Sequence, residues 1–308
     1  MGRSRTPGGP FVVRGHAQAP AWQDAAVAIG NFDGVHAGHR ALLARARDLG
    51  EHVVALTFDP HPSALLAAGG GPPALTDLDR KLELLAEAGA DAIVVEPFTR
   101  ALAALAPDAF MEEIVMRALS ARAIVVGYDF NYGCKRAGSV EHLREHGLRE
   151  GVAIEVVPPV EVDGEPVSST RIRALLAAGD VARAARLLGR PWDVDGVVVH
   201  GAKRGRTIGV PTANIAAPAD LPLRPGIYAV TLDGRPAVAS LGTNPTFVAG
   251  DQLVLEVHVL DFDGDLYDQR VRTAFVGRLR DEAKYASVDA LVAQIRADIA
   301  AARGLLSP

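Results

Sequence analysis

A series of short, continuously apolar runs constrains the fold of the first half of this chain more than any other feature. Five such runs occur, at 25–29, 52–58, 91–98, 122–130 and 153–160. They lack strict alternation, which is typical of strands buried on both faces of a parallel sheet. Amphipathic helical segments separate them. This order predicts a doubly wound α/β domain with right-handed crossovers, and five strands are too few for an eight-stranded β/α barrel.

The pattern changes near residue 188. Two helical segments lead up to this point, and shorter strand-like segments with Asp-Gly or Gly-Thr turns follow it, at 196–201, 226–234, 237–243, 253–264 and 266–280. This spacing predicts an antiparallel barrel or sandwich, followed by a terminal helix that begins on Ser287. We therefore expect one domain over 11–187 and a second over 188–308.

Composition limits the partners and the compartment. The net charge is −5, whereas a protein that binds nucleic acid over its whole surface is usually basic, so an anionic ligand must meet local clusters of cations. The single cysteine, Cys134, excludes an internal disulfide framework and indicates a reducing compartment. No apolar run approaches the roughly 20 residues that span a bilayer. We expect a cytoplasmic protein with neither a nucleic-acid nor a membrane partner, and both a monomer and a weak homo-oligomer remain open.

The segment "GNFDGVHAGHRALLARA" (30–46) follows the run at 25–29 and leads into a helix. Helix starts at the carboxyl ends of parallel strands favour anions, so His36 and His39 would donate hydrogen bonds to a phosphate. Three glycines would let the backbone approach that phosphate closely: Gly30, Gly34 and Gly38. The spacing of three disfavours the helical zinc pattern, which has histidines four apart. A metal site that includes Asp33, or a purely structural histidine pair, stays open.

Two further segments follow other strands of the predicted sheet. They are "TFDPHP" (57–62) and "GYDFNYGCKRAG" (127–138), and the second combines polar Asp129 and Asn131 with a basic pair. A solvated loop would explain that basic pair equally well. Cys134 has no acid or base partner nearby in the sequence, so we interpret it as a bystander.

The segment "SSTRIRALL" (168–176) places three hydroxyls at a helix start and two arginines in its first turn. Ser169 or Thr170 alone would suffice as a cap. Arg171 and Arg173 are unfavourable against the helix dipole unless an anion offsets them. The segment therefore predicts a polyphosphate site, although the chain has neither a Walker P-loop nor a G-x-G-x-x-G fingerprint in this half.

The second half carries its own candidate site. "GVVVHGAKRGRTIGVPTANI" (196–215) is a basic, glycine-rich segment that suits phosphate, and Thr212 and Asn214 would supply hard oxygen ligands to nucleotide-bound Mg²⁺. The alternative is an exposed basic hairpin. In "LVLEVHVLDF" the apolar residues share one face and leave Glu256 on the other, either as a general base or as an ordinary surface residue.

The ordered motifs resemble a known family. "GNFDGVHAGH", "TFDPHP", "GYDFNYG" and "SSTRIR" are similar to the adenylyltransferase module of prokaryotic bifunctional riboflavin kinase/FAD synthetases. "KRGRTIGVPTAN", "PGIYAV", "GTNPTF", "LEVHVLDF" and "QIRADI" resemble their riboflavin kinase barrel. The resemblance extends from about residue 25 to 300. Two residues depart from the family pattern: Asp268 stands where glycine is usual, and Tyr285 where phenylalanine is usual.

The resemblance implies a Rossmann-like nucleotidylyltransferase domain followed by an antiparallel β-barrel kinase domain with a terminal helix. It implies small-molecule substrates only: riboflavin and ATP give FMN, and FMN and a second ATP give FAD and pyrophosphate, with Mg²⁺ as cofactor. Two alternatives stay open, a nucleotidylyltransferase for another phosphorylated acceptor and a non-catalytic flavin-binding protein. A zinc hydrolase is a third.

The resemblance also implies site residues. Those that bind ATP and its phosphates for adenylyl transfer are Gly30, Asn31, Phe32, Asp33, Gly34, His36, Gly38, His39, Asp129, Ser169, Thr170 and Arg173. Among them His36, His39 and Arg173 are expected to act in catalysis. Those that bind ATP or flavin in the kinase are Gly201, Lys203, Gly205, Arg206, Gly209, Pro211, Thr212, Asn214, Asn244, Glu256 and Arg280. Among these, Glu256 is the expected base, and Thr212 and Asn214 hold Mg²⁺.

Overall fold

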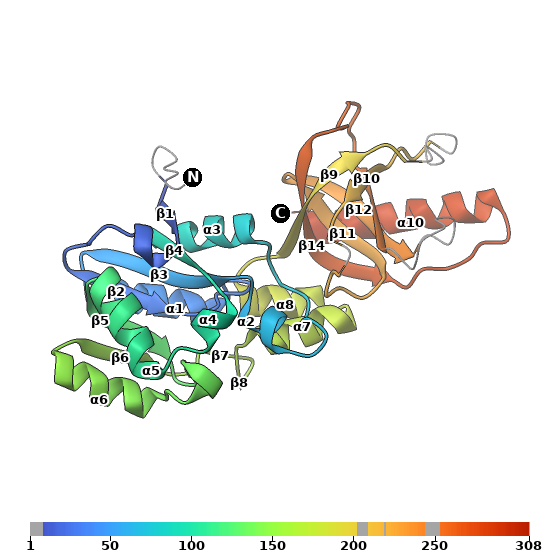
Figure 1. The fold of residues 1–308 in the computed structure, drawn as a ribbon. Helices are drawn as coiled ribbons and strands as arrows, with labels where there is room; N and C mark the ends of the chain where they lie inside the picture. The colour runs from blue at the N-terminus through green and yellow to red at the C-terminus, as the bar shows by residue number, and fades with distance from the viewer. Residues whose placement is uncertain (1–8, 202–208, 219, 244–252, 308) are drawn as a thin grey trace. The chain divides into compact units, whose positions relative to one another are not determined.

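The computed structural model describes residues 9–201, 209–218, 220–243 and 253–307 (Figure 1). The chain forms two compact units, one of residues 1–72 and 77–167 and the other of residues 73–76 and 168–308. The division by packing falls at 168 and not near 188, because α8 (Val181–Leu188) packs on strands of the second unit and buries Leu187 and Leu188. The functional domain limits, 11–187 and 188–308, stay a prediction.

The first unit contains a six-stranded parallel sheet in the order β1-β4-β3-β2-β5-β6. Its strands are β1 (Phe11–Arg14), β2 (Ala25–Ile29), β3 (His52–Asp59), β4 (Ala92–Pro97), β5 (Ala121–Gly127) and β6 (Ala153–Val157). All five expected strands are present, and the doubly wound class is confirmed. Sequence reasoning missed β1, a four-residue edge strand that is only partly buried.

Helices cover both faces of this sheet. One face packs against α1 (Ala37–Arg47) and α3 (Leu78–Glu87) through leucines of both helices. The other packs against α5 (Pro107–Phe110), the π-helical turn that continues it to Ala118, and α6 (Val140–Glu150). Successive strand residues point to opposite faces, so Ala26 and Val27 enter different cores. This two-sided burial explains why the strands are continuously apolar.

Short elements complete the first unit. They are a 3₁₀ turn at His16–Gln18, α2 (Pro62–Leu66), α4 (Arg100–Ala103), a 3₁₀ turn at Cys134–Arg136, and the hairpin of β7 (Glu161–Val162) and β8 (Glu165–Pro166).

The second unit contains a closed antiparallel barrel in the order β10-β13-β12-β11-β14-β9. Its strands are β9 (Trp192–Val199), β10 (Ala213–Ala216), β11 (Gly226–Leu232), β12 (Arg235–Thr243), β13 (Leu253–Val259) and β14 (Arg270–Arg280). The barrel is therefore confirmed over the alternative of a sandwich. Trp192, Tyr228 and Phe275 fill its interior, and the Trp192 indole donates a hydrogen bond to the Leu75 carbonyl at 2.9 Å.

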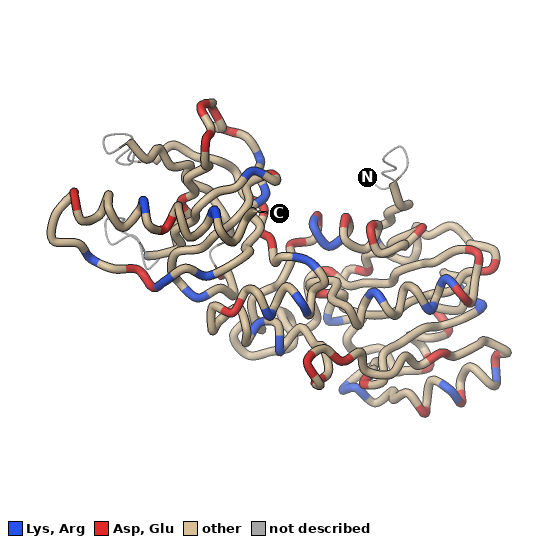
Figure 2. The backbone as a smooth tube through the Cα atoms, turned by 180° about the vertical axis from the view of Figure 1, so that it is seen from behind, with Lys and Arg blue, Asp and Glu red and all other residues tan. Residues whose placement is uncertain are grey.

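Among the described residues, three helices accompany the barrel. They are α7 (Ser169–Ala178), α8 and the terminal α10 (Val288–Leu306), which packs on β11, β12 and β14. Ser287 caps α10 as expected, since its side chain accepts from the Ala290 amide at 3.2 Å. Within the described ranges, no helix combines the length and apolar character that crossing a membrane requires. Figure 2 shows both signs of charge distributed along the helices and loops of each unit.

Candidate active sites in the two units

The loop between β2 and α1 adopts an unusual backbone. Phe32 and Val35 have positive φ angles of 51° and 42°, and Gly34 lies between them at 81°. A β-branched residue in this region costs about 1–3 kcal/mol, which the surroundings must offset. Phe32 and Val35 are fully buried, so packing holds the loop in this conformation. Strain of this kind is typical of functional sites.

This loop presents His36 and His39 as a stacked pair. Their ring centroids lie 3.6 Å apart with an interplanar angle of 16°. His36 caps α1, because its Nδ1 accepts from the His39 amide at 3.4 Å. A neutral His36 ring that accepts at Nδ1 carries its proton on Nε2, which leaves an N–H to donate. Gly38 packs closely beside it, since a Cβ there would lie 3.2 Å from the His36 ring.

Both histidines are neutral near pH 7. Burial lowers the pKa of His36 to about 4. The pKa of His39 lies well below its usual value, chiefly through burial and further through the nearby charges of His36 and Lys81. The Nδ1 atom of His39 is buried with no hydrogen-bond partner among the described residues. The pair can therefore serve as N–H donors, but not as cations.

The stacking disfavours the zinc alternative. A ring nitrogen binds zinc at about 2.0–2.1 Å roughly in the plane of its ring, and two nearly parallel rings 3.6 Å apart do not direct their nitrogens at one point. In the part of the chain that the structure describes, no group of three His, Cys, Asp or Glu side chains is placed to hold a metal ion. The geometry favours hydrogen bonding to a ligand.

The other two candidate loops of the first unit lie at the same edge of the sheet. Because β3 and β5 flank β2 in parallel, the segments that follow these three strands are neighbours. Thr57 donates to the Asn31 carbonyl at 3.1 Å, which ties two of the segments together. On the third, Asp129 is exposed and the Asn131 side chain donates to its carbonyl at 2.7 Å. The edge thus gathers Gly30–His39, residues 57–62 and Asp129.

The remaining expected residues for adenylyl transfer lie in the second compact unit. There Ser168 caps α7 by accepting from the Arg171 amide at 3.2 Å, so neither Ser169 nor Thr170 is needed as the cap. Arg173 donates from Nε to the Pro73 carbonyl at 2.7 Å. The binding roles of Ser169, Thr170 and Arg173 stay predictions.

Sequence reasoning missed one buried charge at the first site. Lys81, on α3, is only 6% exposed. Burial lowers its pKa, and the carboxylates of Asp33 and Asp59 act in the opposite direction. In the helical segment 76–90, Lys81 stands among other charged residues. No local signal in the sequence shows that its side chain is the buried one.

In the barrel, strand register brings together two expected kinase residues. Asn214 on β10 pairs directly with Glu256 on β13, and Glu256 pairs with Ser240 on β12. Directly opposed residues place their side chains on the same face. The backbone of Gly201 packs on the Asn214 amide, because a Cβ there would lie 2.1 Å from its Nδ2. Leu255 and Val257 are buried on the other face, which confirms the expected orientation of Glu256.

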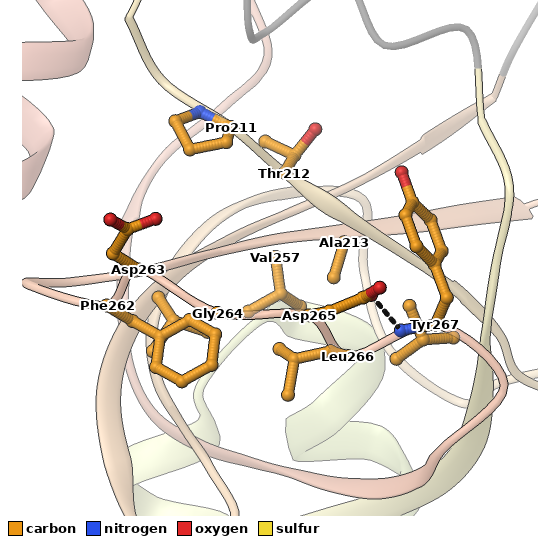
Figure 3. Close-up of a pocket in the computed structure, with 12 residues that line it drawn as sticks. Pro211, Thr212, Ala213, Val257, Phe262, Asp263, Gly264, Asp265, Leu266 and Tyr267 are labelled. Atoms are coloured by element: carbon orange, nitrogen blue, oxygen red, sulfur yellow. Dashed lines mark hydrogen bonds between the residues drawn. The ribbon is translucent and has the colours of Figure 1, made fainter.

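A cavity of about 410 Å³ lies beside Thr212. Figure 3 shows Pro211 and Thr212 on one side and the segment 262–267 on the other. Its lining comprises Val198, Pro211, Thr212, Ala213, Val257, Val259, Phe262, Asp263, Gly264, Asp265, Leu266 and Tyr267. Asp265 accepts from the Tyr267 amide at 2.9 Å, and the Tyr267 ring lies 4.0 Å from that of His200. Apart from Pro211 and Thr212, none of these residues was predicted to be a site residue.

The other residues expected in the kinase site lie in different parts of the second unit, and some lie outside the described residues. Arg280 binds the Asp298 carboxylate with two nitrogens, at 2.9 and 2.7 Å, and joins β14 to α10. Its expected contact with a substrate stays a prediction. Gly209 has a φ of 77°, which suits glycine. Lys203, Gly205, Arg206 and Asn244 lie outside the described residues.

The structure also describes Asp268 and Tyr285, the two residues that depart from the family pattern. Asp268 has a φ of 61°, a left-handed conformation that glycine adopts freely and aspartate tolerates. Tyr285 lies against Arg280, whose guanidinium carbon is 5.8 Å from the centre of the ring.

The first unit is a parallel α/β fold with two N–H donors, His36 and His39, at the start of a helix. The second is a barrel in which Asn214 and Glu256 are paired. Together they fit a two-unit nucleotide-dependent transferase. Residues 18–171 match the family model for FAD synthetase, and residues 188–306 match the model for riboflavin kinase. A bifunctional riboflavin kinase/FMN adenylyltransferase from Pseudomonas fluorescens is 40% identical over 306 residues, covering 96% of this chain and 98% of that protein.

The corresponding protein of Escherichia coli K12 is 39% identical over 311 residues, covering 96% and 99% of the two chains. A solved structure described as a macrolide-efflux protein from Streptococcus pneumoniae has a TM-score of 0.86 and 32% identity, covering 95% and 98%. The chain belongs to the family of bifunctional riboflavin kinase/FMN adenylyltransferases. It phosphorylates riboflavin to FMN and adenylylates FMN to FAD.

The buried His36 predicts a specific loss of stability in acid. Its pKa is about 4 in the folded chain and 6.5 in the unfolded chain. Below pH 6.5 the unfolded state therefore binds a proton that the folded state does not, and stability falls as the pH drops from 6.5 toward 4. At pH 5 the loss from His36 is about 2 kcal/mol.

The His36→Asn variant keeps a good helix-capping side chain and lacks this titration. Urea unfolding at pH 7 and pH 5 should show a larger fall in the free energy of unfolding for the native chain than for the variant. The same pH dependence in both proteins would contradict the burial of a neutral His36.

Proposed function

We propose that the two reactions use separate sets of side chains, one at the carboxyl edge of the parallel sheet and one on the barrel. The observation that carries this proposal is that the stacked histidine pair and the Asn214–Glu256 pair belong to different compact units. Each set suits one of the two chemistries.

Adenylyl transfer suits the histidine pair because it requires no base. The FMN phosphate, with a second pKa of about 6, is largely dianionic near neutral pH. One of its oxygens bonds to the α-phosphorus of ATP, and the bond from that phosphorus to the β-bridging oxygen breaks, so that pyrophosphate leaves with the electron pair. The obstacle is repulsion between anions. N–H donors of His36, His39 and the start of α1 offset that charge as it develops.

Phosphorylation of riboflavin needs a base, because a ribityl hydroxyl is a weak nucleophile. Glu256 accepts the hydroxyl proton while the oxygen bonds to the γ-phosphorus and ADP leaves. A positioned general base typically contributes about 10²–10⁴-fold. Its neighbour Asn214 is held by the close backbone of Gly201, so the two groups keep a fixed relation on adjacent strands.

The barrel residues also fit Mg²⁺. This ion prefers oxygen ligands and usually takes one or two from the protein and the rest from phosphates and water. The Thr212 hydroxyl and the Asn214 amide oxygen would hold it. When bound, Mg²⁺ neutralises charge on the transferring phosphoryl group. The cavity beside Thr212, with apolar walls and the Asp263 carboxylate as an acceptor for amino groups, suits the adenosine of ATP.

We expect His36→Ala to abolish FAD formation from FMN and to leave FMN formation from riboflavin within twofold of the native rate. The loss follows from removing a donor that the adenylyl transition state needs, and one such donor is typically worth about 10²–10³ in kcat. Chromatography of the flavins measures both reactions in one chain. Equal loss of both activities would contradict separate sites.

The corresponding variant for the kinase reaction is Glu256→Gln, which keeps the shape of the side chain and removes its basicity. Riboflavin phosphorylation should fall by about 10²–10⁴-fold, while FMN supplied directly is converted to FAD at the native rate. His36→Ala serves as its matched control. Normal kinase turnover in Glu256→Gln would remove this residue from the role of base.

A further inference from the structure

Lys81 is a buried charge that is not among the residues expected to bind ATP. It lies on α3 and is 6% exposed. Lysine is almost never buried to this degree unless its ammonium is paired. The charges that act on it are the carboxylates of Asp33 and Asp59, and its own charge acts on His39.

These neighbours all belong to the carboxyl edge of the parallel sheet that carries His36 and His39, called the histidine edge below. Asp33 is 3% exposed in the strained loop after β2, Asp59 ends β3, and His39 lies in the first turn of α1. Lys81 comes from a fourth element, more than forty residues along the chain from the histidine motif. The fold therefore buries a lysine whose charge acts on residues of the site, on a helix that carries no recognisable phosphate motif.

The adjacent residue provides a contrast. Arg80 is 8% exposed, nearly as buried as Lys81. Its guanidinium binds carboxylates of its own helix, Glu83 at 2.9 Å and Glu87 at 3.2 Å. Arg80 thus has carboxylate partners on its own helix, whereas the carboxylates that act on Lys81 belong to the site.

The site needs a positive charge that its histidines do not supply. Burial keeps His36 and His39 neutral at pH 7, so they contribute dipoles only. ATP and FMN together bring several negative charges, and a cation in a partly desolvated site offsets them far better than one in water. Asp33 and Asp59 favour the charged form of the Lys81 ammonium against the effect of burial.

We propose that Lys81 is a further phosphate-stabilising residue of FMN adenylylation, whose ammonium offsets the negative charge that passes to pyrophosphate as the α-phosphorus changes partners. This inference deepens, and rests on, the proposed assignment of adenylyl transfer to the histidine edge. Asp33 and Asp59 support this role, since their negative charges favour the charged form of the ammonium. The competing explanation is that Lys81 merely neutralises two carboxylates.

The test compares Lys81→Met with the matched control Arg80→Met in the full chain. Lys81→Met should lower kcat for FAD formation from FMN by about 100-fold or more at saturating ATP, as expected for loss of one group that acts in the transition state. Riboflavin phosphorylation in the same chain should stay within twofold. Arg80→Met should keep FAD formation within about threefold, and Lys81→Arg, which keeps the charge, should recover at least tenfold over Lys81→Met.

Asp59→Asn combined with Lys81→Met separates the two explanations, even where the single variant unfolds in part, because Asp59 is not among the expected ATP-binding residues. It removes one carboxylate together with the cation, so a purely neutralising role predicts that FAD formation returns. A phosphate-stabilising role predicts that the double variant stays at least as inactive as Lys81→Met. Urea unfolding of each variant confirms that the first unit is folded under the assay conditions.

The outcomes also distinguish this inference from the proposed function beneath it. If Lys81→Met matches Arg80→Met, or if the double variant regains activity, the role of Lys81 is overturned. If His36→Ala is inactive in that case, the histidine edge stands as the adenylyl site without Lys81. If His36→Ala forms FAD normally as well, the assignment of the edge itself fails.

Discussion

The parallel pairing of β2 with β3 and β5 is the constraint on which the proposed adenylyl site depends. It brings the ends of three strands to one edge, where the strained loop 30–36 and the start of α1 meet residues 57–62 and Asp129. Burial of Phe32 and Val35 holds the loop in a conformation that its own backbone disfavours. The hydrophobic core thus fixes the geometry of the polar site above it.

Burial has a second effect, on charge. A histidine pair in water would be partly protonated near neutral pH, and packing removes that charge while it preserves the N–H donors. In the proposed account the positive charge comes instead from Lys81, where Asp33 and Asp59 oppose the lowering of its pKa by burial. The barrel reaction differs because we propose that it needs a base, and strand register places Glu256, the proposed base, opposite Asn214. The two proposed sites therefore differ in their electrostatics: one offsets negative charge for a phosphate nucleophile, and the other provides a base for a hydroxyl.

Local pattern was enough to predict the strands and the histidine motif, since continuous apolar runs and glycine spacing are properties of short segments. It failed for β1, a four-residue edge strand of mixed burial, and for β10, which is short and follows Pro211. It failed for Lys81, because only the tertiary fold brings α3 to Asp33 and Asp59. The cavity residues 262–267 form a loop whose shape depends on its neighbours. The helical pattern of α8 does not show which unit the helix packs on, and its contacts with β9 and β14 place it with the barrel.

The most direct test of this account is a time course of the native chain with riboflavin, ATP and Mg²⁺, with flavins and pyrophosphate measured together. We predict that FMN appears first, that FAD follows with one pyrophosphate released for each FAD, and that supplied FMN gives FAD without a lag. A chain that makes FMN but never converts supplied FMN to FAD would contradict the central claim that both sites are functional.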